Sequence, residues 1–235
     1  MVGNLSGLPI AGSRTRGSDG GRGNVLWLIL LTSIARPAVA LELPPAQINH
    51  ALKIVLRVYN YAKVPRKTLA SALQEAQHIF EKANVETDWL VCPIAASPEK
   101  PNSACDDEKP SGLLVIDVSV LPESMADRLD AHDEDVGFAL STSGGGGFEA
   151  GVFSDRVTKL AESRRIVDCR LLLAVVMAHE IGHLLLGRES HSPSGIMRAT
   201  WDREEMALAG QGYLLFTPGQ AEQLRRALAM KVHQP

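Results

Sequence analysis

The stretch HEIGHLLLGRESHSPSGIM, His179–Met197, holds three of the chain's seven histidines within thirteen residues. It continues an apolar run that predicts a buried helix over residues 164–187. His179 and His183 are four residues apart, so on a helix their rings project from the same face, one turn apart. Such a face has three interpretations: core packing, a structural metal clip or a catalytic metal.

The spacing of this pair suits zinc. Imidazole nitrogens from His179 and His183 can reach one zinc ion at about 2.0–2.1 Å, and Glu180 can reach a water on the metal without binding the ion itself. Burying such polar groups without partners would cost roughly 2–7 kcal/mol each. A metal removes that cost, so core packing is the weaker interpretation. No cysteine lies near the motif, which argues against a structural clip.

The third ligand has more than one candidate. Gly187 predicts the end of the helix as a left-handed cap. His191 follows after three residues, enough chain to swing it back toward the metal. Glu189 is the alternative, because a carboxylate binds zinc at a similar distance. A further variant uses Glu204 or Glu205. Three protein ligands and one open position are typical of catalytic zinc.

This pattern resembles the metzincin family of zinc endopeptidases, which combines the helical motif, a glycine, a third histidine and a methionine in a turn. The matching residues are His179, Glu180, His183, Gly187, His191 and Met197. In the family the glycine and third histidine come seven and ten residues after the first histidine. Here they come at eight and twelve, and Glu189 stands at ten. The resemblance implies a zinc cofactor, Glu180 as general base and Met197 as an apolar floor beneath the metal.

Residues 137–157 predict two strands around a glycine run ahead of the helix. In the matrixin-like arrangement that the resemblance implies, Phe138, Ala139 and Leu140 form the edge strand of the substrate cleft. A peptide or protein substrate would add to that edge as an extra strand. An ordinary hairpin is the alternative.

The remaining chain alternates strands and helices. Apolar patterns predict strands at 53–64, 87–93 and 112–121 and a helix at 66–85. The strand at 112–121 is continuously apolar, which predicts a central strand covered on both faces. Thr217, Pro218 and Gln220 predict a capping box that begins the last helix.

This order indicates an α+β domain over residues 41–235 with one core. The resemblance implies a zincin-like fold. Such a fold has a small mixed twisted sheet, a helix after the first strand, a buried active-site helix and a C-terminal helix.

The three cysteines predict one disulfide. Cys92 and Cys105 flank a proline-containing segment that cannot pack itself, and a bridge there would contribute roughly 3 kcal/mol. Cys169 lies beside the apolar helical run and is predicted to be a buried free thiol. Three free thiols are the alternative.

The N-terminus predicts export. Arginines precede the apolar run Val25–Ala35, and Ala38 and Ala40 form an A-x-A cleavage site, so the mature chain is predicted to begin at Leu41. A membrane anchor at residues 25–35 is the alternative, although eleven apolar residues are short for a bilayer. The predicted location is periplasmic or extracellular.

Charge excludes one class of partner. Residues 1–40 hold four arginines and one aspartate, which leaves 20 cationic and 26 anionic residues, a net charge of −6, in the remainder. Such a body is unsuited to nucleic-acid phosphates. We therefore expect a monomeric, exported zinc hydrolase, an endopeptidase, without a membrane span in the mature chain. The alternatives are a zinc amide hydrolase acting on another bond, or a secreted binding module with a structural metal.

Overall fold

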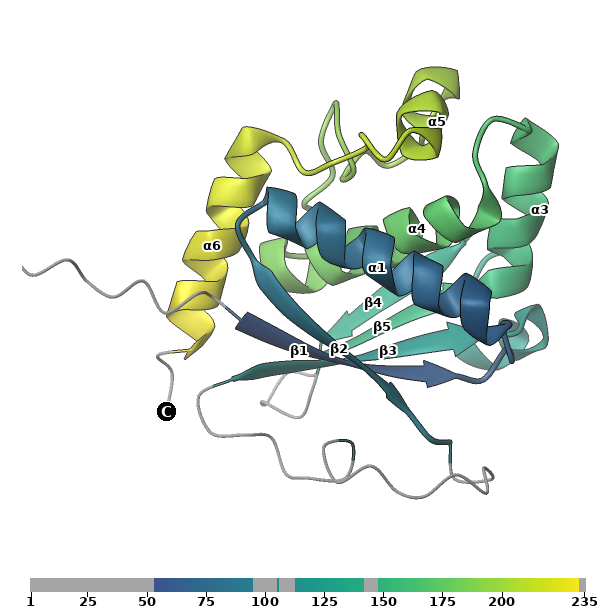
Figure 1. Cartoon of the computed structure of the whole chain (residues 1–235), viewed down its shortest axis with the longest axis horizontal. Coiled ribbons are helices and arrows are strands. Elements are labelled where there is room, and N and C mark those ends of the chain that lie inside the picture. Colours follow the sequence, from purple (N-terminus) through teal and green to yellow (C-terminus); the bar gives the residue numbers. More distant parts are fainter. Residues whose placement is uncertain (1–52, 95–104, 106–112, 142–147, 233–235) are drawn as a thin grey trace, which may run out of the picture. The chain divides into compact units, whose positions relative to one another are not determined.

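Five strands form one mixed sheet in the order β2-β1-β3-β5-β4 (Figure 1). Their bounds are β1 Lys53–Asn60, β2 Glu86–Cys92, β3 Leu114–Leu121, β4 Gly137–Ser141 and β5 Phe148–Phe153. All neighbours pair in parallel except β4, which runs antiparallel to β5. The expected small mixed sheet is therefore confirmed, with β4 as one of its outer strands.

The computed structural model describes residues 53–94, 105, 113–141 and 148–232, all of which fall in the compact unit Ile48–Pro235. The predicted signal peptide, the alternative anchor and the start at Leu41 lie outside the described residues. They stay predictions.

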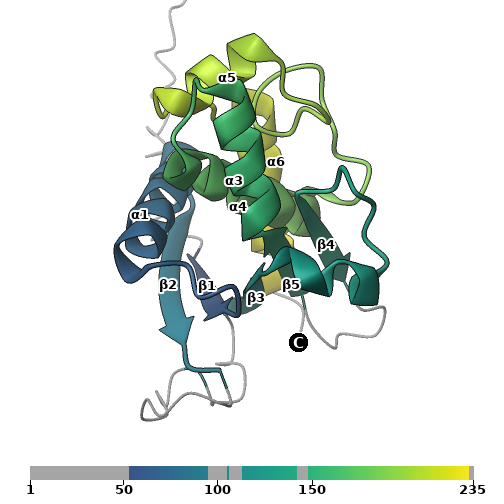
Figure 2. The same cartoon turned by 90° about the vertical axis from the view of Figure 1, so that its right-hand side faces the viewer.

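Alternation along the strands sends one set of side chains toward the helices. In β1 Ile54, Leu56 and Val58 are fully buried on this face, whereas Arg57 points to the other. Helix α1 (Arg66–Lys82) follows β1 and covers the same face (Figures 1 and 2). Its apolar residues at helical spacing are all buried: Leu69, Leu73, Ala76, Ile79 and Phe80. The helix predicted after the first strand is confirmed.

Helix α4 (Cys169–Leu186) lies beside α1 in the core and carries the histidine motif (Figure 2). Thirteen of its 18 residues are buried, so little of its surface faces solvent. Its length and mean hydropathy would also suit a membrane span. Because it packs against α1, β4 and β5, however, it is the core helix of this unit.

The region before α4 differs from the prediction. The strand expected to reach residue 157 ends at Phe153, and helix α3 (Ser154–Arg164) follows it at once. The long helix predicted from residue 164 begins only at Cys169. Arg165 takes a left-handed conformation that ends α3, and the side chain of Asp168 accepts the backbone N–H of Arg170 at 2.8 Å to begin α4.

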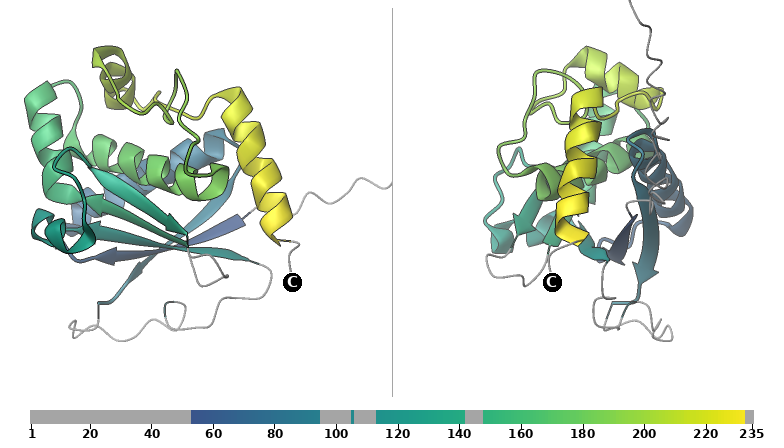
Figure 3. Two further views of the ribbon diagram at one scale, coloured as in Figure 1. Left: turned by 180° about the vertical axis from the view of Figure 1, so that it is seen from behind. Right: turned by 90° about the vertical axis from the view of Figure 1, so that its left-hand side faces the viewer.

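Two helices complete the unit. Helix α5 (Arg203–Gly210) was not predicted; it begins at a capping box between Asp202 and Glu205. Helix α6 (Pro218–Val232) stands against α4 at one end of the sheet (Figure 3). Its predicted capping box is confirmed, because Thr217 N–H donates to Gln220 Oε1 at 2.8 Å and Gln220 N–H donates to Thr217 Oγ1 at 3.3 Å.

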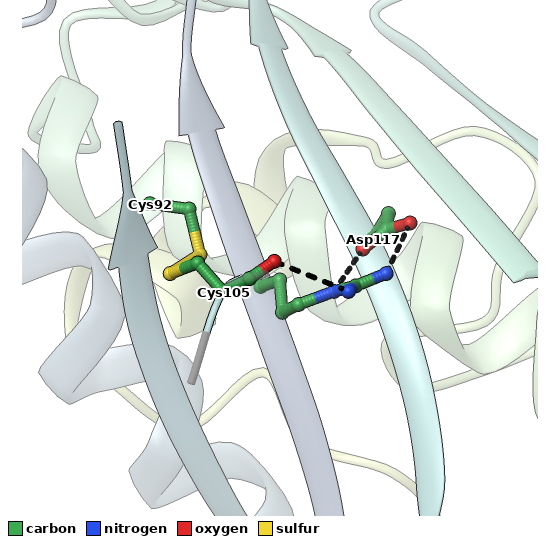
Figure 4. The surroundings of a disulfide bond; sticks show 4 residues. Cys92, Cys105 and Asp117 are labelled. Atoms are coloured by element: carbon green, nitrogen blue, oxygen red, sulfur yellow. Dashed lines mark hydrogen bonds and ion pairs between the residues drawn. A yellow bond between two sulfur atoms is a disulfide. The ribbon is translucent and has the colours of Figure 1, made fainter. Parts of the chain in front are cut away.

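The face of the sheet opposite the helices carries polar side chains, a small apolar cluster and the disulfide. Cys92 and Cys105 are bonded as predicted (Figure 4). Beside them Arg57 forms a two-pronged ion pair with Asp117, at 2.7 and 2.9 Å. Strand β3 is central, as expected, and its second face is covered in part among the described residues: Leu121 is buried in a small apolar cluster with Phe153, whereas the side chain of Asp117 is partly exposed. Cys169 is a free thiol, only partly buried.

Candidate metal centre

Helix α4 presents three polar side chains at one end of the core. His179 and Glu180 are 8% and 7% exposed, and His183 is half-buried one turn later. His191 reaches the same point from the segment after the helix. Suitable ligand atoms of His179, His183 and His191 all lie within 4.8 Å of one another, which would allow one metal ion to bind between them.

The contacts between the rings favour a cation. His183 Nε2 lies 3.0 Å from His179 Nε2 and 3.1 Å from His191 Nε2, close to the roughly 3.3 Å between two nitrogens on one tetrahedral zinc. His179 Nδ1 faces the carbonyl oxygen of Ile196 at 2.8 Å and must carry a hydrogen, so a neutral His179 has its lone pair on Nε2. Without a metal, the one hydrogen on His183 Nε2 would have to be donated to both His179 Nε2 and His191 Nε2. A metal ion instead accepts the lone pairs of all three nitrogen atoms.

Protonation is a poor substitute for a metal at neutral pH. Burial lowers the pKa of His179 to about 4, and burial also lowers the pKa of His183. Both rings are therefore held neutral, which is the form that binds metal.

A backbone carbonyl orients the first histidine. Ile196 O accepts from His179 Nδ1 and also from Trp201 Nε1, at 3.2 Å. The Trp201 ring meets the edge of His179 with centroids 5.3 Å apart. These contacts fix both the tautomer and the orientation of the His179 ring. Hydrogen-bond partners of metal-binding histidines usually have this effect.

The second histidine is oriented at the end of the helix. His183 Nδ1 lies 3.1 Å from Ser190 Oγ and 3.4 Å from the carbonyl oxygen of Gly187. Gly187 ends the helix as predicted, but its φ of 106° and ψ of 161° lie outside the left-handed helical region we expected. That conformation is essentially restricted to glycine, and it sends the chain away from the helix axis toward His191.

The structure brings His191, rather than the other candidates, to the cluster. Glu189, which holds the family's usual position, is exposed and is absent from the group of converging ligand atoms. Glu205 instead pairs with Arg198 at 2.5 Å and accepts the backbone N–H of Asp202 at 3.1 Å. Within the part of the chain that the structure describes, the group that could hold a metal is thus three histidines.

Met197 lies directly under the motif. It is fully buried, and a Cβ added at Gly182 would come within 2.5 Å of its sulfur. A glycine inside the helical motif therefore lets the methionine approach the backbone of α4. The role of Met197 as an apolar floor beneath a metal, which the resemblance implies, stays a prediction.

Glu180 is seated against strand β4. A Cβ added at Gly137 would lie 2.7 Å from Glu180 Oε1, so the absence of a side chain there makes room for the carboxyl group. Burial, followed by the charge of Asp135, raises the pKa of Glu180 to about 8. In the metal-free protein this carboxyl group is mostly protonated at pH 7.

A cavity of about 430 Å³ opens over these groups. Its lining includes His179, Glu180, His183, His191 and Trp201, together with the segment from Glu134 to Gly137. A larger cavity of about 930 Å³ lies between α1 and β2, but neither histidine nor carboxylate lines it. Chemistry, rather than size, therefore marks the smaller cavity as the candidate site.

The predicted substrate edge is the outer strand β4 beside this cavity. Phe138, however, turns to the opposite face of the sheet, where it packs against Phe153 with ring centroids 5.9 Å apart. Leu140 is half exposed. Any role of Phe138, Ala139 and Leu140 in substrate binding would accordingly come from the strand backbone.

Comparison with solved structures adds a loose likeness. No protein-family model matches the chain, and no curated protein sequence does. A crystal structure of archaemetzincin from Methanopyrus kandleri overlaps it with a TM-score of 0.45 and 14% sequence identity, over 77% of this chain and 99% of that one. An overlap this loose decides neither the fold family nor the activity.

Several residues around the centre were missed from the sequence. Trp201, Ser190, Gly137 and the carbonyl group of Ile196 all touch a motif residue. None has a spacing pattern of its own. Trp201 alone offered a signal, as a large aromatic residue four positions after the methionine.

Proposed function

We propose that this chain is a zinc-dependent hydrolase with a zincin-like fold related to that of metzincins, and that it acts as an endopeptidase. The observation that carries the proposal is the meeting of three imidazole Nε2 atoms beside a buried glutamate. His179, His183 and His191 would hold the ion. A fourth protein ligand is absent from the converging group among the described residues, which is typical of a catalytic site.

When bound, zinc supplies a Lewis acid and a nucleophilic water at neutral pH. A carboxylate oxygen of Glu180 would take a proton from the attacking water and would pass it to the leaving amine nitrogen. A nearby dication lowers the pKa of a carboxyl group, so metal binding would return Glu180 to the ionised form that a base requires. The Glu180 residue is only 7% exposed, which limits contact between this proton and bulk water.

An extended peptide is the substrate that the surroundings suit best. β4 is an outer strand whose first residue, Gly137, lines the cavity next to Glu180. Backbone pairing with an outer strand binds a peptide irrespective of most side chains, and would lay its carbonyl groups across the metal.

Export is part of the proposal. The apolar run at residues 25–35 and the A-x-A site support it. The Cys92–Cys105 disulfide also supports it, because such bonds persist in oxidising compartments.

The test is Glu180→Gln, which removes the base but no ligand. We expect this variant to retain one zinc ion and to lose at least about 100-fold in peptide hydrolysis, in line with the loss of a general base. Glu189→Gln is the matched control, an exposed glutamate on the nearby segment, and it should cleave at the parent rate. Peptide-library digestion and metal analysis give both readouts.

The same experiment separates the alternatives. A parent protein that binds zinc but cleaves no peptide would favour a hydrolase of another amide bond or a structural metal. Hydrolysis by Glu180→Gln at the parent rate would remove Glu180 from the mechanism.

A further inference from the structure

The segment that carries His191 is closed on itself by short hydrogen bonds. Ser192, the next residue, donates its hydroxyl hydrogen to Ser194 O at 2.8 Å and its backbone N–H to Met197 O at 2.9 Å. These bonds give the segment its local shape. They cannot fix its position relative to α4, because both partners belong to the same segment.

Gln220, on α6, supplies a fixed point outside the segment. Its Nε2 donates to Ser192 Oγ at 2.6 Å, although the two residues are 28 positions apart. The side chain is buried, with 7% exposed. The orientation of the amide group is settled by Thr217, whose backbone N–H can only donate and does so to Gln220 Oε1.

The resulting chain of hydrogen bonds is consistent in direction. Gln220 donates to Ser192, and Ser192 in turn donates to Ser194 O. Each hydroxyl and amide atom named therefore has a partner of the correct type, which makes the tether well defined.

Close packing places the same segment against the start of α6. Ile196 N–H donates to Leu215 O at 3.0 Å. Gly195 has a φ of 78°, and a Cβ there would lie 2.9 Å from Thr217 Cγ2. The turn between His191 and Met197 thus contacts the residues that begin the C-terminal helix.

We propose that Gln220 is a positioning residue for His191 and that the C-terminal helix is thereby part of the metal-binding apparatus. The inference rests on the proposed function only in taking His191 as a ligand. His191 lies two positions farther from the helical motif than the family spacing. A longer connection samples more conformations, so a tether on the adjacent residue raises the fraction in which His191 faces the metal.

The experiment measures the zinc dissociation constant of the full, disulfide-bonded chain by competition with a chelator at neutral pH. Gln220→Met keeps the length of the side chain but removes both polar atoms, and Ser192→Ala removes only the hydroxyl group. We expect each to raise the dissociation constant about 10-fold or more, as is typical for groups behind a metal ligand. The double variant should have a zinc dissociation constant no higher than that of the more affected single variant, because both changes remove the same hydrogen bond between Gln220 and Ser192.

Thr217→Val is the matched control. It removes the hydroxyl group that caps α6 but keeps the methyl group against Gly195 and leaves the Gln220 side chain in place. We expect a lower melting temperature with a dissociation constant within about twofold of the parent, on the order of the effects seen away from a ligand. Loss of helix stability and loss of the tether are thereby separated.

Three results would overturn the inference. The first is an unchanged dissociation constant in Gln220→Met, and the second is a full additional loss when Gln220→Met is placed on Ser192→Ala. A third is a loss in Thr217→Val as large as that in Gln220→Met, which would assign the effect to the helix cap. Failure of the proposed function would give a different experimental result. A parent that binds zinc without hydrolysing peptides, and loses zinc in both variants, would leave the tether standing.

Discussion

Replacing Glu180 with a residue that cannot ionise should stabilise the metal-free protein near neutral pH. The carboxyl group is 7% exposed, and burial followed by the charge of Asp135 raises its pKa from 4.5 to about 8. A raised pKa means that the folded state binds the proton more tightly than the unfolded state does. The contribution of Glu180 to stability is therefore complete below pH 4.5 and is lost as the pH rises through 8.

The size of the effect follows from the same shift. At pH 7, which is about 2.5 units above the ordinary pKa of 4.5, ionisation of Glu180 stabilises the unfolded chain by about 3 kcal/mol, at 1.36 kcal/mol per unit. At pH 5 the gain is below about 1 kcal/mol. Glutamine does not titrate, so the stability of Glu180→Gln relative to the parent should rise by about 2–3 kcal/mol from pH 5 to pH 7.

Urea unfolding of the chelator-treated, disulfide-bonded proteins at both pH values measures this difference. His179, whose pKa burial lowers to about 4, contributes stability above pH 6.5 that is lost as the pH falls toward 4. It is present in both proteins, and its effect cancels in the comparison. Glu189→Gln, the exposed control, should follow the parent at each pH. If the free energy of unfolding of Glu180→Gln exceeds that of the parent by the same amount at pH 5 and pH 7, or does not exceed it at pH 7, burial does not raise the pKa of Glu180 as argued.

The remaining predictions concern the ligand set, the packing and the covalent structure. Zinc affinity should fall at least about 100-fold in His191→Ala and hardly change in Glu189→Ala, measured by chelator competition; the reverse ranking would make the third ligand a carboxylate. Gly182→Ala should lower the free energy of unfolding by about 1–3 kcal/mol, because its Cβ would meet the sulfur below it; calorimetry without a shift would contradict that contact. Thiol titration of the denatured, non-reduced chain should find one thiol, from Cys169. Mass spectrometry of the exported protein should find Leu41 at the N-terminus, and an intact Met1 inside the cell would exclude cleavage.

Local rules account for what the sequence determined by itself. His179 and His183 lie one turn apart on one helix, so their common face follows from the helical repeat alone. The capping box at Thr217 and Gln220 spans four residues and was predicted for the same reason. The Cys92–Cys105 bond closes a short segment, and the central position of β3 follows from its apolar run. Each of these features depends on neighbours in sequence.

Helix boundaries show where local patterns stop being sufficient. Residues 164–168 continue the apolar and charged pattern of a helix, yet the chain turns at Arg165 and restarts at Asp168. Both segments suit a helix, and their separation depends on how α3 packs beside α4. Propensity is overridden there by tertiary contacts.

Only the tertiary structure decided which side chain joins His179 and His183 in the candidate metal centre. His191 and Glu189 are chemically comparable ligands, and the choice between them depends on where the turn after Gly187 is held. That turn is held by Leu215 and Gln220, which come much later in the chain. The space for the Glu180 side chain likewise comes from Gly137, which lies on strand β4. A contact between residues tens of positions apart leaves no periodic trace in sequence, because it is set by the packing of α4 between the sheet and α6 rather than by the repeat of any one element.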